Sequence, residues 1–126
     1  MVLIIADDLG FGDLSCAGAS AFKTPNIDSL ASRGIVFQQG YATASTCTPS
    51  RYSMFTGEYA WRQKKSKTGI LAGDDPLCIP TNVITLQKFS SRRDTPLAAV
   101  GKWHLGLGDG SAPLILIPKY VQIQMT

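Results

Sequence analysis

Apolar residues fall into short runs along this chain, and each run gives way to polar residues or glycine. One run covers 2–6 and ends at Asp7 and Asp8, a second covers 35–37, and a third covers 97–100. Continuous apolar runs of this length are typical of strands that are buried on both faces. We therefore predict strands at these three places.

The pattern between the first two runs predicts a helix over residues 25–33. Thr24 is a suitable N-cap, Pro25 fits the first helical position, and Gly34 fits a helix stop. Apolar residues inside the segment recur at helical spacing, which gives the helix one apolar face. Strands that alternate with helices indicate an α/β fold.

The segment over residues 47–57, CTPSRYSMFTG, holds the most specific candidate chemistry. Proline is favoured at the first position of a helix, so we predict a helix that starts at Pro49 and ends at Gly57. Cys47 would then lie against unpaired backbone N–H groups, with Arg51 roughly one turn further along. This arrangement indicates an anion site with its own nucleophile, although Cys47 as a small buried apolar residue is the alternative.

The first apolar run delivers two adjacent carboxylates, Asp7 and Asp8. Ligands in open α/β sheets bind at the carboxyl ends of strands, and neighbouring carboxylates repel each other unless a cation lies between them. Hard oxygen ligands favour calcium or magnesium. The alternative is a pair of aspartates that serve a turn or a helix cap.

The third run leads into Gly101, Lys102, Trp103 and His104. Alternation along an extended backbone would place Lys102 and His104 on one side and Trp103 on the other. A cation and an imidazole would then face the same crevice. The alternative for His104, the only histidine in the chain, is a hydrogen-bonded structural role.

These three segments together resemble the sulfatase family. The resemblance rests on C-x-P-S-R followed by Thr-Gly at 47–57, on Asp-Asp-Leu-Gly at 7–10 and on GKWHLG at 101–106. It implies that a formylglycine-generating enzyme converts Cys47 to formylglycine, whose hydrate attacks the sulfur of a sulfate ester. It also implies that calcium, with magnesium as the alternative, is held by Asp7, Asp8 and the modified Cys47.

The resemblance assigns further roles and a fold. Arg51 and Lys102 would bind the hydrate and the sulfate, and His104 would accept a proton. The fold implied is a partial alkaline-phosphatase-like α/β domain, with a mostly parallel central sheet flanked by helices and without its carboxyl-terminal part. Residues 1–113 would be the amino-terminal part of the catalytic domain, and 114–126 an off-pattern tail.

Several alternatives stay open on the sequence alone. Substrates would be sulfated small molecules or sulfated glycans, yet phosphonate or phosphodiester hydrolysis by the same superfamily is the nearest alternative. Two aspartates and one modified residue supply fewer oxygens than the six to eight that calcium takes. The second alternative is therefore a non-catalytic fragment that binds metal or anions weakly.

Composition limits which partners and which cellular compartment we expect. The net charge of +3 is too small to indicate nucleic-acid binding, and no apolar stretch is long enough to span a membrane. Members of the resembled family are often lysosomal, secreted or periplasmic, but no signal peptide precedes the first apolar run, so the compartment is not assigned. Cys16 and Cys78 are expected to be buried free thiols, with a disulfide between them as the alternative.

Overall fold

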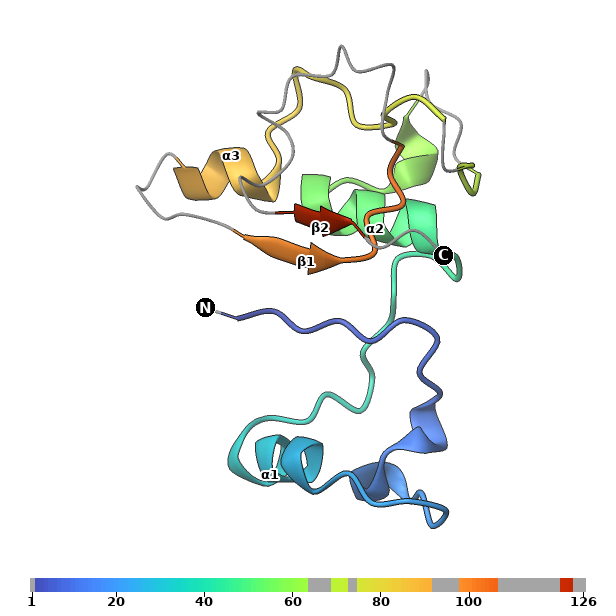
Figure 1. Cartoon of the computed structure of the whole chain (residues 1–126), viewed down its shortest axis with the longest axis vertical. Coiled ribbons are helices and arrows are strands. Elements are labelled where there is room, and N and C mark those ends of the chain that lie inside the picture. Colours follow the sequence, from blue (N-terminus) through green and yellow to red (C-terminus); the bar gives the residue numbers. More distant parts are fainter. Residues whose placement is uncertain (1, 64–68, 73–74, 92–97, 107–120, 124–126) are drawn as a thin grey trace. The chain divides into compact units, whose positions relative to one another are not determined.

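The computed structural model describes residues 2–63, 69–72, 75–91, 98–106 and 121–123. The chain divides into two compact units, Met1–Tyr41 and Ala42–Thr126 (Figure 1). Each unit has its own short elements.

The first unit contains two 3-10 helices, η1 (Phe11–Asp13) and η2 (Ser15–Ala17), followed by helix α1 (Pro25–Arg33). The bounds of α1 confirm the helix predicted over 25–33. Thr24 precedes it without a side-chain capping bond, because its hydroxyl is hydrogen-bonded to Ser15 and Asp28 instead.

The strands predicted over 2–6 and 35–37 are wrong for this structure, because neither segment adopts strand geometry. Their apolar side chains are exposed, with Val2 at 85% and Ile35 at 82% of full exposure. A strand buried on both faces needs neighbouring strands on its edges and layers on its faces. Neither segment has a strand partner among the described residues.

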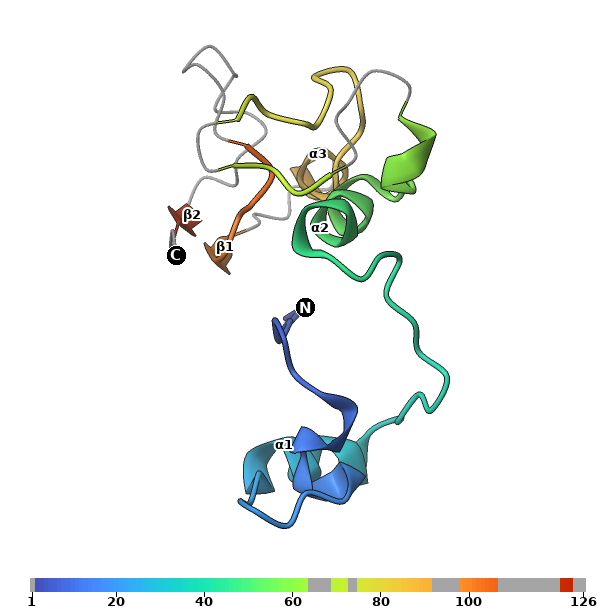
Figure 2. The same ribbon diagram turned by 90° about the vertical axis from the view of Figure 1, so that its right-hand side faces the viewer.

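The second unit contains helices α2 (Cys47–Thr56) and α3 (Leu86–Ser91), the 3-10 helix η3 (Ala60–Arg62), and strands β1 (Ala99–Gly101) and β2 (Val121–Ile123). Helices α2 and α3 pack against each other, and a view close to their axes shows both on one side of the strand pair (Figure 2). This unit therefore combines helices and strands in one compact body.

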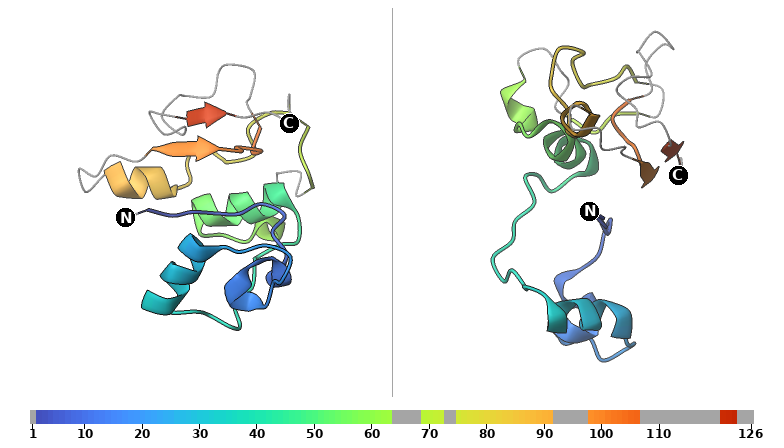
Figure 3. Two further views of the ribbon diagram at one scale, coloured as in Figure 1. Left: turned by 60° about the horizontal axis from the view of Figure 1, so that its bottom comes forward. Right: turned by 90° about the vertical axis from the view of Figure 1, so that its left-hand side faces the viewer.

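Strands β1 and β2 are parallel, with Ala99 opposite Val121 and Gly101 opposite Ile123 (Figure 3). Strand β1 overlaps the run predicted over 97–100, of which Leu97 lies outside the described residues. The α/β class and the parallel pairing agree with prediction. A larger central sheet flanked by helices is not formed within the part of the chain that the structure describes.

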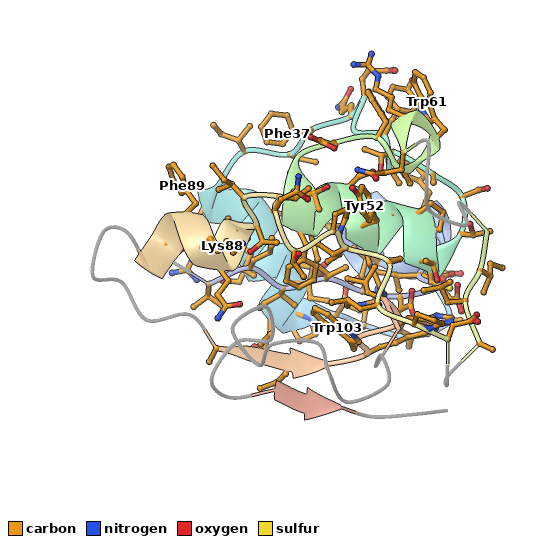
Figure 4. The ribbon with its side chains drawn as sticks, turned by 90° about the horizontal axis from the view of Figure 1, so that it is seen from above. Phe37, Tyr52, Trp61, Lys88, Phe89 and Trp103 are labelled. Atoms are coloured by element: carbon orange, nitrogen blue, oxygen red, sulfur yellow. The ribbon has the colours of Figure 1, made fainter. Side chains whose placement is uncertain are left out.

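The described core belongs to the second unit. Tyr52, Ala60, Ile79, Trp103 and Leu105 form one buried cluster, with Phe55, Leu77 and Cys78 packed against it. The rings of Phe55 and Trp103 pack edge to face, with their centroids 5.2 Å apart. Figure 4 shows Tyr52 on α2 and Trp103 between that helix and β1. The core thus joins α2 to the segment that follows β1.

Two further predictions concern the carboxyl-terminal tail and membrane-spanning segments. Of the predicted tail over 114–126, residues 114–120 and 124–126 lie outside the described part of the structure. No helix among the described residues is both long enough and apolar enough to cross a bilayer.

Candidate functional site

Helix α2 begins at Cys47, two residues before the predicted start at Pro49. The first helical hydrogen bond runs from the Ser50 N–H to the Thr46 carbonyl, at 3.3 Å. Proline at the third helical position costs nothing, since an N–H there has no intrahelical partner in any case. Cys47 is therefore in the first turn itself, half-buried, where the helix dipole favours an anion.

The predicted end of this helix is confirmed at Gly57. Its φ of 73° lies in the left-handed region, and its N–H donates to the Ser53 carbonyl at 2.8 Å. Glycine adopts that conformation without the steric cost that a Cβ would bring. The length and direction of the helix that carries Cys47 and Arg51 are thus fixed at both ends.

Two side chains of α2 fasten the helix to the segment after β1. The Thr48 hydroxyl donates to the carbonyl of His104 at 3.0 Å, and the Arg51 guanidinium donates to the carbonyl of Lys102. These bonds connect residues more than fifty positions apart in the chain. They bring the first turns of α2 together with Lys102 and His104.

Burial in the segment after β1 follows the predicted alternation. Trp103 is buried, with 4% of its surface exposed, while Lys102 and His104 are half-buried. The indole N–H of Trp103 donates to the Gly106 carbonyl at 2.9 Å, which satisfies its one polar atom. The segment is not a continuous strand, however, because β1 ends at Gly101.

Two non-glycine residues in the described chain have positive φ angles, and both are predicted site residues. Asp8 has φ of 58° and His104 has φ of 51°. This region is uncommon for residues with a Cβ, and such conformations concentrate at functional sites. His104 is held there by hydrogen bonds on both its backbone and its ring, since Nε2 lies 2.8 Å from the Leu71 carbonyl oxygen.

Sequence reasoning missed two residues that connect the site, Thr48 and Leu71. Thr48 is 3% exposed, and besides its bond to His104 its hydroxyl accepts the Leu71 N–H at 3.2 Å. Thr48 follows Cys47 directly, which is the only signal that the sequence carried for it. Leu71 acts through its backbone, so its side-chain identity gave no signal.

Asp7 and Asp8 belong to the first unit, and both are exposed. They therefore lie in a different unit from Cys47, the third predicted metal ligand. Within the described ranges, no group of three or more His, Cys, Asp or Glu side chains is arranged to hold a metal ion. The two adjacent carboxylates are the kind of ligand that a hard cation prefers, but they supply fewer oxygen ligands than such a cation takes.

All three cysteines are free thiols, but Cys16 is exposed rather than buried as predicted. It lies on a short 3-10 helix that has no buried residue, in a unit where none of the described residues 2–41 is buried. Burial raises the pKa of the Cys78 thiol to about 11. Cys78 is therefore a protonated packing residue at neutral pH.

Comparison with known proteins agrees with the three motifs. The sequence model of the family described as Sulfatase matches residues 1–112. An N-acetylgalactosamine-6-O-sulfatase from Bacteroides thetaiotaomicron is 48% identical over 108 residues, which are 86% of this chain and 21% of that protein. Human arylsulfatase H is 44% identical over 119 residues, covering 88% of this chain and 21% of that protein.

Comparison with solved structures also finds a similar protein. A solved structure from work on glycosaminoglycan metabolism by Bacteroides thetaiotaomicron superposes with a TM-score of 0.84 at 41% identity. The superposition covers 94% of this chain and 26% of that one. The chain thus spans about a fifth of the length of the curated relatives above.

Proposed function

Since this chain belongs to the sulfatase family, we propose that it supplies the nucleophile-bearing part of a site that hydrolyses sulfate esters. The observation that carries the proposal is the pair of hydrogen bonds that fasten α2, with Cys47 in its first turn, to the Lys102–His104 segment. A nucleophile, two cations and a proton acceptor then belong to one packed unit.

Each residue has a role that follows from the chemistry of a sulfate ester. The ester is an anion, so Lys102, Arg51 and the amino-terminal end of α2 favour its binding and stabilise the charge that develops on its oxygens. Arg51 donates to the Lys102 carbonyl, and a guanidinium is a planar cation whose geometry suits a two-point contact with an oxyanion. His104 accepts a proton during turnover.

The modification and the metal supply the remaining chemistry. Oxidation of Cys47 to formylglycine would replace the thiol by an aldehyde whose hydrate offers oxygen nucleophiles. Asp7 and Asp8 are the residues that would hold a divalent cation, with calcium as the best match to carboxylate ligands. Such a cation would lower the pKa of a bound hydroxyl. Further oxygen ligands beyond these carboxylates are needed to complete a calcium shell.

The substrate class proposed is a sulfated small molecule or a sulfated sugar. The named relatives include an N-acetylgalactosamine-6-O-sulfatase and an arylsulfatase, which the chain matches over 86% and 88% of its length. None of the described residues distinguishes a sugar from an aryl leaving group, so both remain within the proposal. Phosphonate and phosphodiester substrates enter as comparison compounds in the test.

A second candidate is a domain that binds anions or metal weakly without turnover. It is favoured by a specific observation, the lack of a three-ligand acidic or histidine cluster within the described ranges. A divalent cation held by two carboxylates alone would exchange readily with solvent. The same site geometry would then bind sulfate without hydrolysing its esters.

The test begins with expression of the chain alongside a formylglycine-generating enzyme and mass spectrometry of the peptide that contains position 47. The converted protein is then assayed for release of 4-nitrophenol from the sulfate ester, with the phosphate and phosphonate analogues beside it. We expect hydrolysis of the sulfate ester in the presence of calcium, and a loss of roughly 10³-fold or more in Cys47→Ala.

Cys16→Ala is the matched control, because it removes an exposed thiol from the other unit and should retain the full rate. Folded, converted protein that binds sulfate but hydrolyses none of the three esters would support the binding domain instead. Faster hydrolysis of the phosphonate than of the sulfate would reassign the substrate class.

A further inference from the structure

The imidazole of His104 is committed to one hydrogen bond that determines where its proton resides. Its Nε2 lies 2.8 Å from the carbonyl oxygen of Leu71. A carbonyl oxygen only accepts, so Nε2 must carry the proton. A neutral imidazole has a single N–H, and the lone pair is therefore on Nδ1.

Nδ1 is buried and has no hydrogen-bond partner among the described residues. A buried acceptor without a partner is destabilising, and such atoms are uncommon in folded proteins. Nε2, by contrast, is satisfied by the backbone. The two ring nitrogens thus have different environments, and the unpartnered one carries the basic lone pair.

Thr48 holds the backbone groups on which this arrangement depends. Its hydroxyl donates to the His104 carbonyl at 3.0 Å and accepts the Leu71 N–H at 3.2 Å. The hydroxyl thus uses its one proton and one of its two lone pairs. The residue that follows Cys47 therefore connects both chain segments that orient the imidazole.

We propose that Thr48 and the Leu71 backbone form a positioning device that fixes His104 as the Nε2–H tautomer and makes Nδ1 the proton-accepting atom of the site. The role of that atom in turnover rests on the proposed function. In that step an O–H bond at residue 47 breaks, its electron pair stays on oxygen, and the proton forms a new bond to Nδ1. No oxidant or reductant is involved.

The chain offers a direct spectroscopic test because His104 is its only histidine. Protein labelled with ¹⁵N in histidine and ¹³C in the leucine carbonyls gives one imidazole spectrum. For the full wild-type chain we expect protonated Nε2, unprotonated Nδ1, and a scalar coupling across the hydrogen bond from Nε2 to the Leu71 carbonyl carbon. A spectrum with the proton on Nδ1, or without that coupling, would overturn the proposal.

Substitutions then test the part assigned to Thr48. Thr48→Val should weaken the coupling and raise the ratio of Nδ1–H to Nε2–H tautomer roughly fivefold, as expected for loss of about 1 kcal/mol of hydrogen bonding. Thr48→Ser keeps the hydroxyl and should restore the wild-type spectrum. Thr85→Val is the matched control, because Thr85 is an equally buried threonine whose hydroxyl accepts the Lys88 N–H instead.

A Thr48→Val spectrum identical to wild type would show that Thr48 positions nothing. If Thr48→Val does not fold, Thr48→Ser and the wild-type coupling still decide the tautomer. The spectra require no turnover, so failure of the hydrolysis assay with an intact coupling would reject the proposed function and leave the positioning device standing.

Discussion

Gly106 lies at a place in the second unit where a side chain does not fit. Its φ is 82°, and a Cβ built on it would be 2.2 Å from the Pro76 carbonyl oxygen. The contact is with backbone, which cannot rotate away as a side chain can. Gly106 also accepts the Trp103 indole N–H, so its position affects the residue next to His104.

Three glycine substitutions should therefore form a graded series in urea unfolding of the chain. Gly106→Ala combines backbone strain with a clash and should lower the free energy of unfolding by about 2 kcal/mol or more. Gly57→Ala strains the left-handed backbone, but its Cβ meets no described atom within 4 Å, so it should lower the free energy of unfolding by about 1 kcal/mol. In Gly69→Ala the added Cβ meets no atom of the described residues within 4 Å, so this variant serves as the control, with a change below about 0.5 kcal/mol. Equal costs at 106 and 69 would contradict the packing described.

Among single residues, Cys47, Arg51, Lys102 and His104 are predicted site residues because they stand in short motifs and their types suit the binding and hydrolysis of an anionic ester. The left-handed backbone of His104 and the bonds made by Thr48 were not predictable from pattern. They depend on which carbonyl happens to meet a hydroxyl across more than fifty residues of chain. Local spacing carries no information on such contacts.

At the scale of elements, η2 is joined to α1 by a cluster of hydrogen bonds that converge on Asp28. Its carboxylate accepts from the Ser15 and Thr24 hydroxyls and from the Cys16 N–H. The Ser15 hydroxyl does most to hold the pKa of Asp28 below its ordinary value, with smaller contributions from Thr24 and Cys16. The connection is thus complete when Asp28 is ionised.

We expect Ser15→Ala to raise the pKa of Asp28 toward the ordinary aspartate value of about 3.9. Because the folded pKa is depressed, its contribution to stability is present above that ordinary value and is lost as pH falls through the folded pKa. A carboxyl ¹³C titration by NMR measures the shift directly. Ser20→Ala, at an exposed serine of the same unit, should leave it unchanged. An unaltered titration in Ser15→Ala would exclude the hydroxyl as the cause.

The elements also show how far sequence patterns reach. Helix α1 matched its predicted bounds, since Pro25 and Gly34 act locally on the backbone. The start of α2 was displaced by two residues because proline fits any position in the first turn that lacks an intrahelical N–H bond. The apolar runs at 2–6 and 35–37 form no strand, because strand pairing requires partners that a local pattern does not specify.

At the scale of the molecule, the two units differ in how much they bury. None of the described residues in 2–41 is buried, and the buried residues in the described chain all belong to the second unit. In α1 the apolar face includes Ile27 and Leu30, which are 44% and 59% exposed. Most helical stability in proteins comes from packing of an apolar face, so α1 is less stabilised than α2.

Hydrogen exchange should therefore separate two helices of similar length. Amides of α2 are expected to exchange at least about tenfold more slowly than those of α1, because opening α2 exposes Tyr52 and the contacts around it. Exchange followed by mass spectrometry of the intact, folded chain gives both rates in one experiment. Equal protection of the two helices would contradict the account of where stability resides.

The central claim is that residue 47 receives the sulfuryl group of a substrate, and a Cys47→Ser variant tests it most directly. A serine hydroxyl can accept the group but, unlike a hydrated aldehyde, has no second hydroxyl to expel it. After incubation with 4-nitrophenyl sulfate and calcium, the tryptic peptide 34–51 should carry one sulfate on position 47, with one equivalent of 4-nitrophenol released. A folded Cys47→Ser protein whose peptide stays unmodified, or carries sulfate on another residue, would contradict the claim.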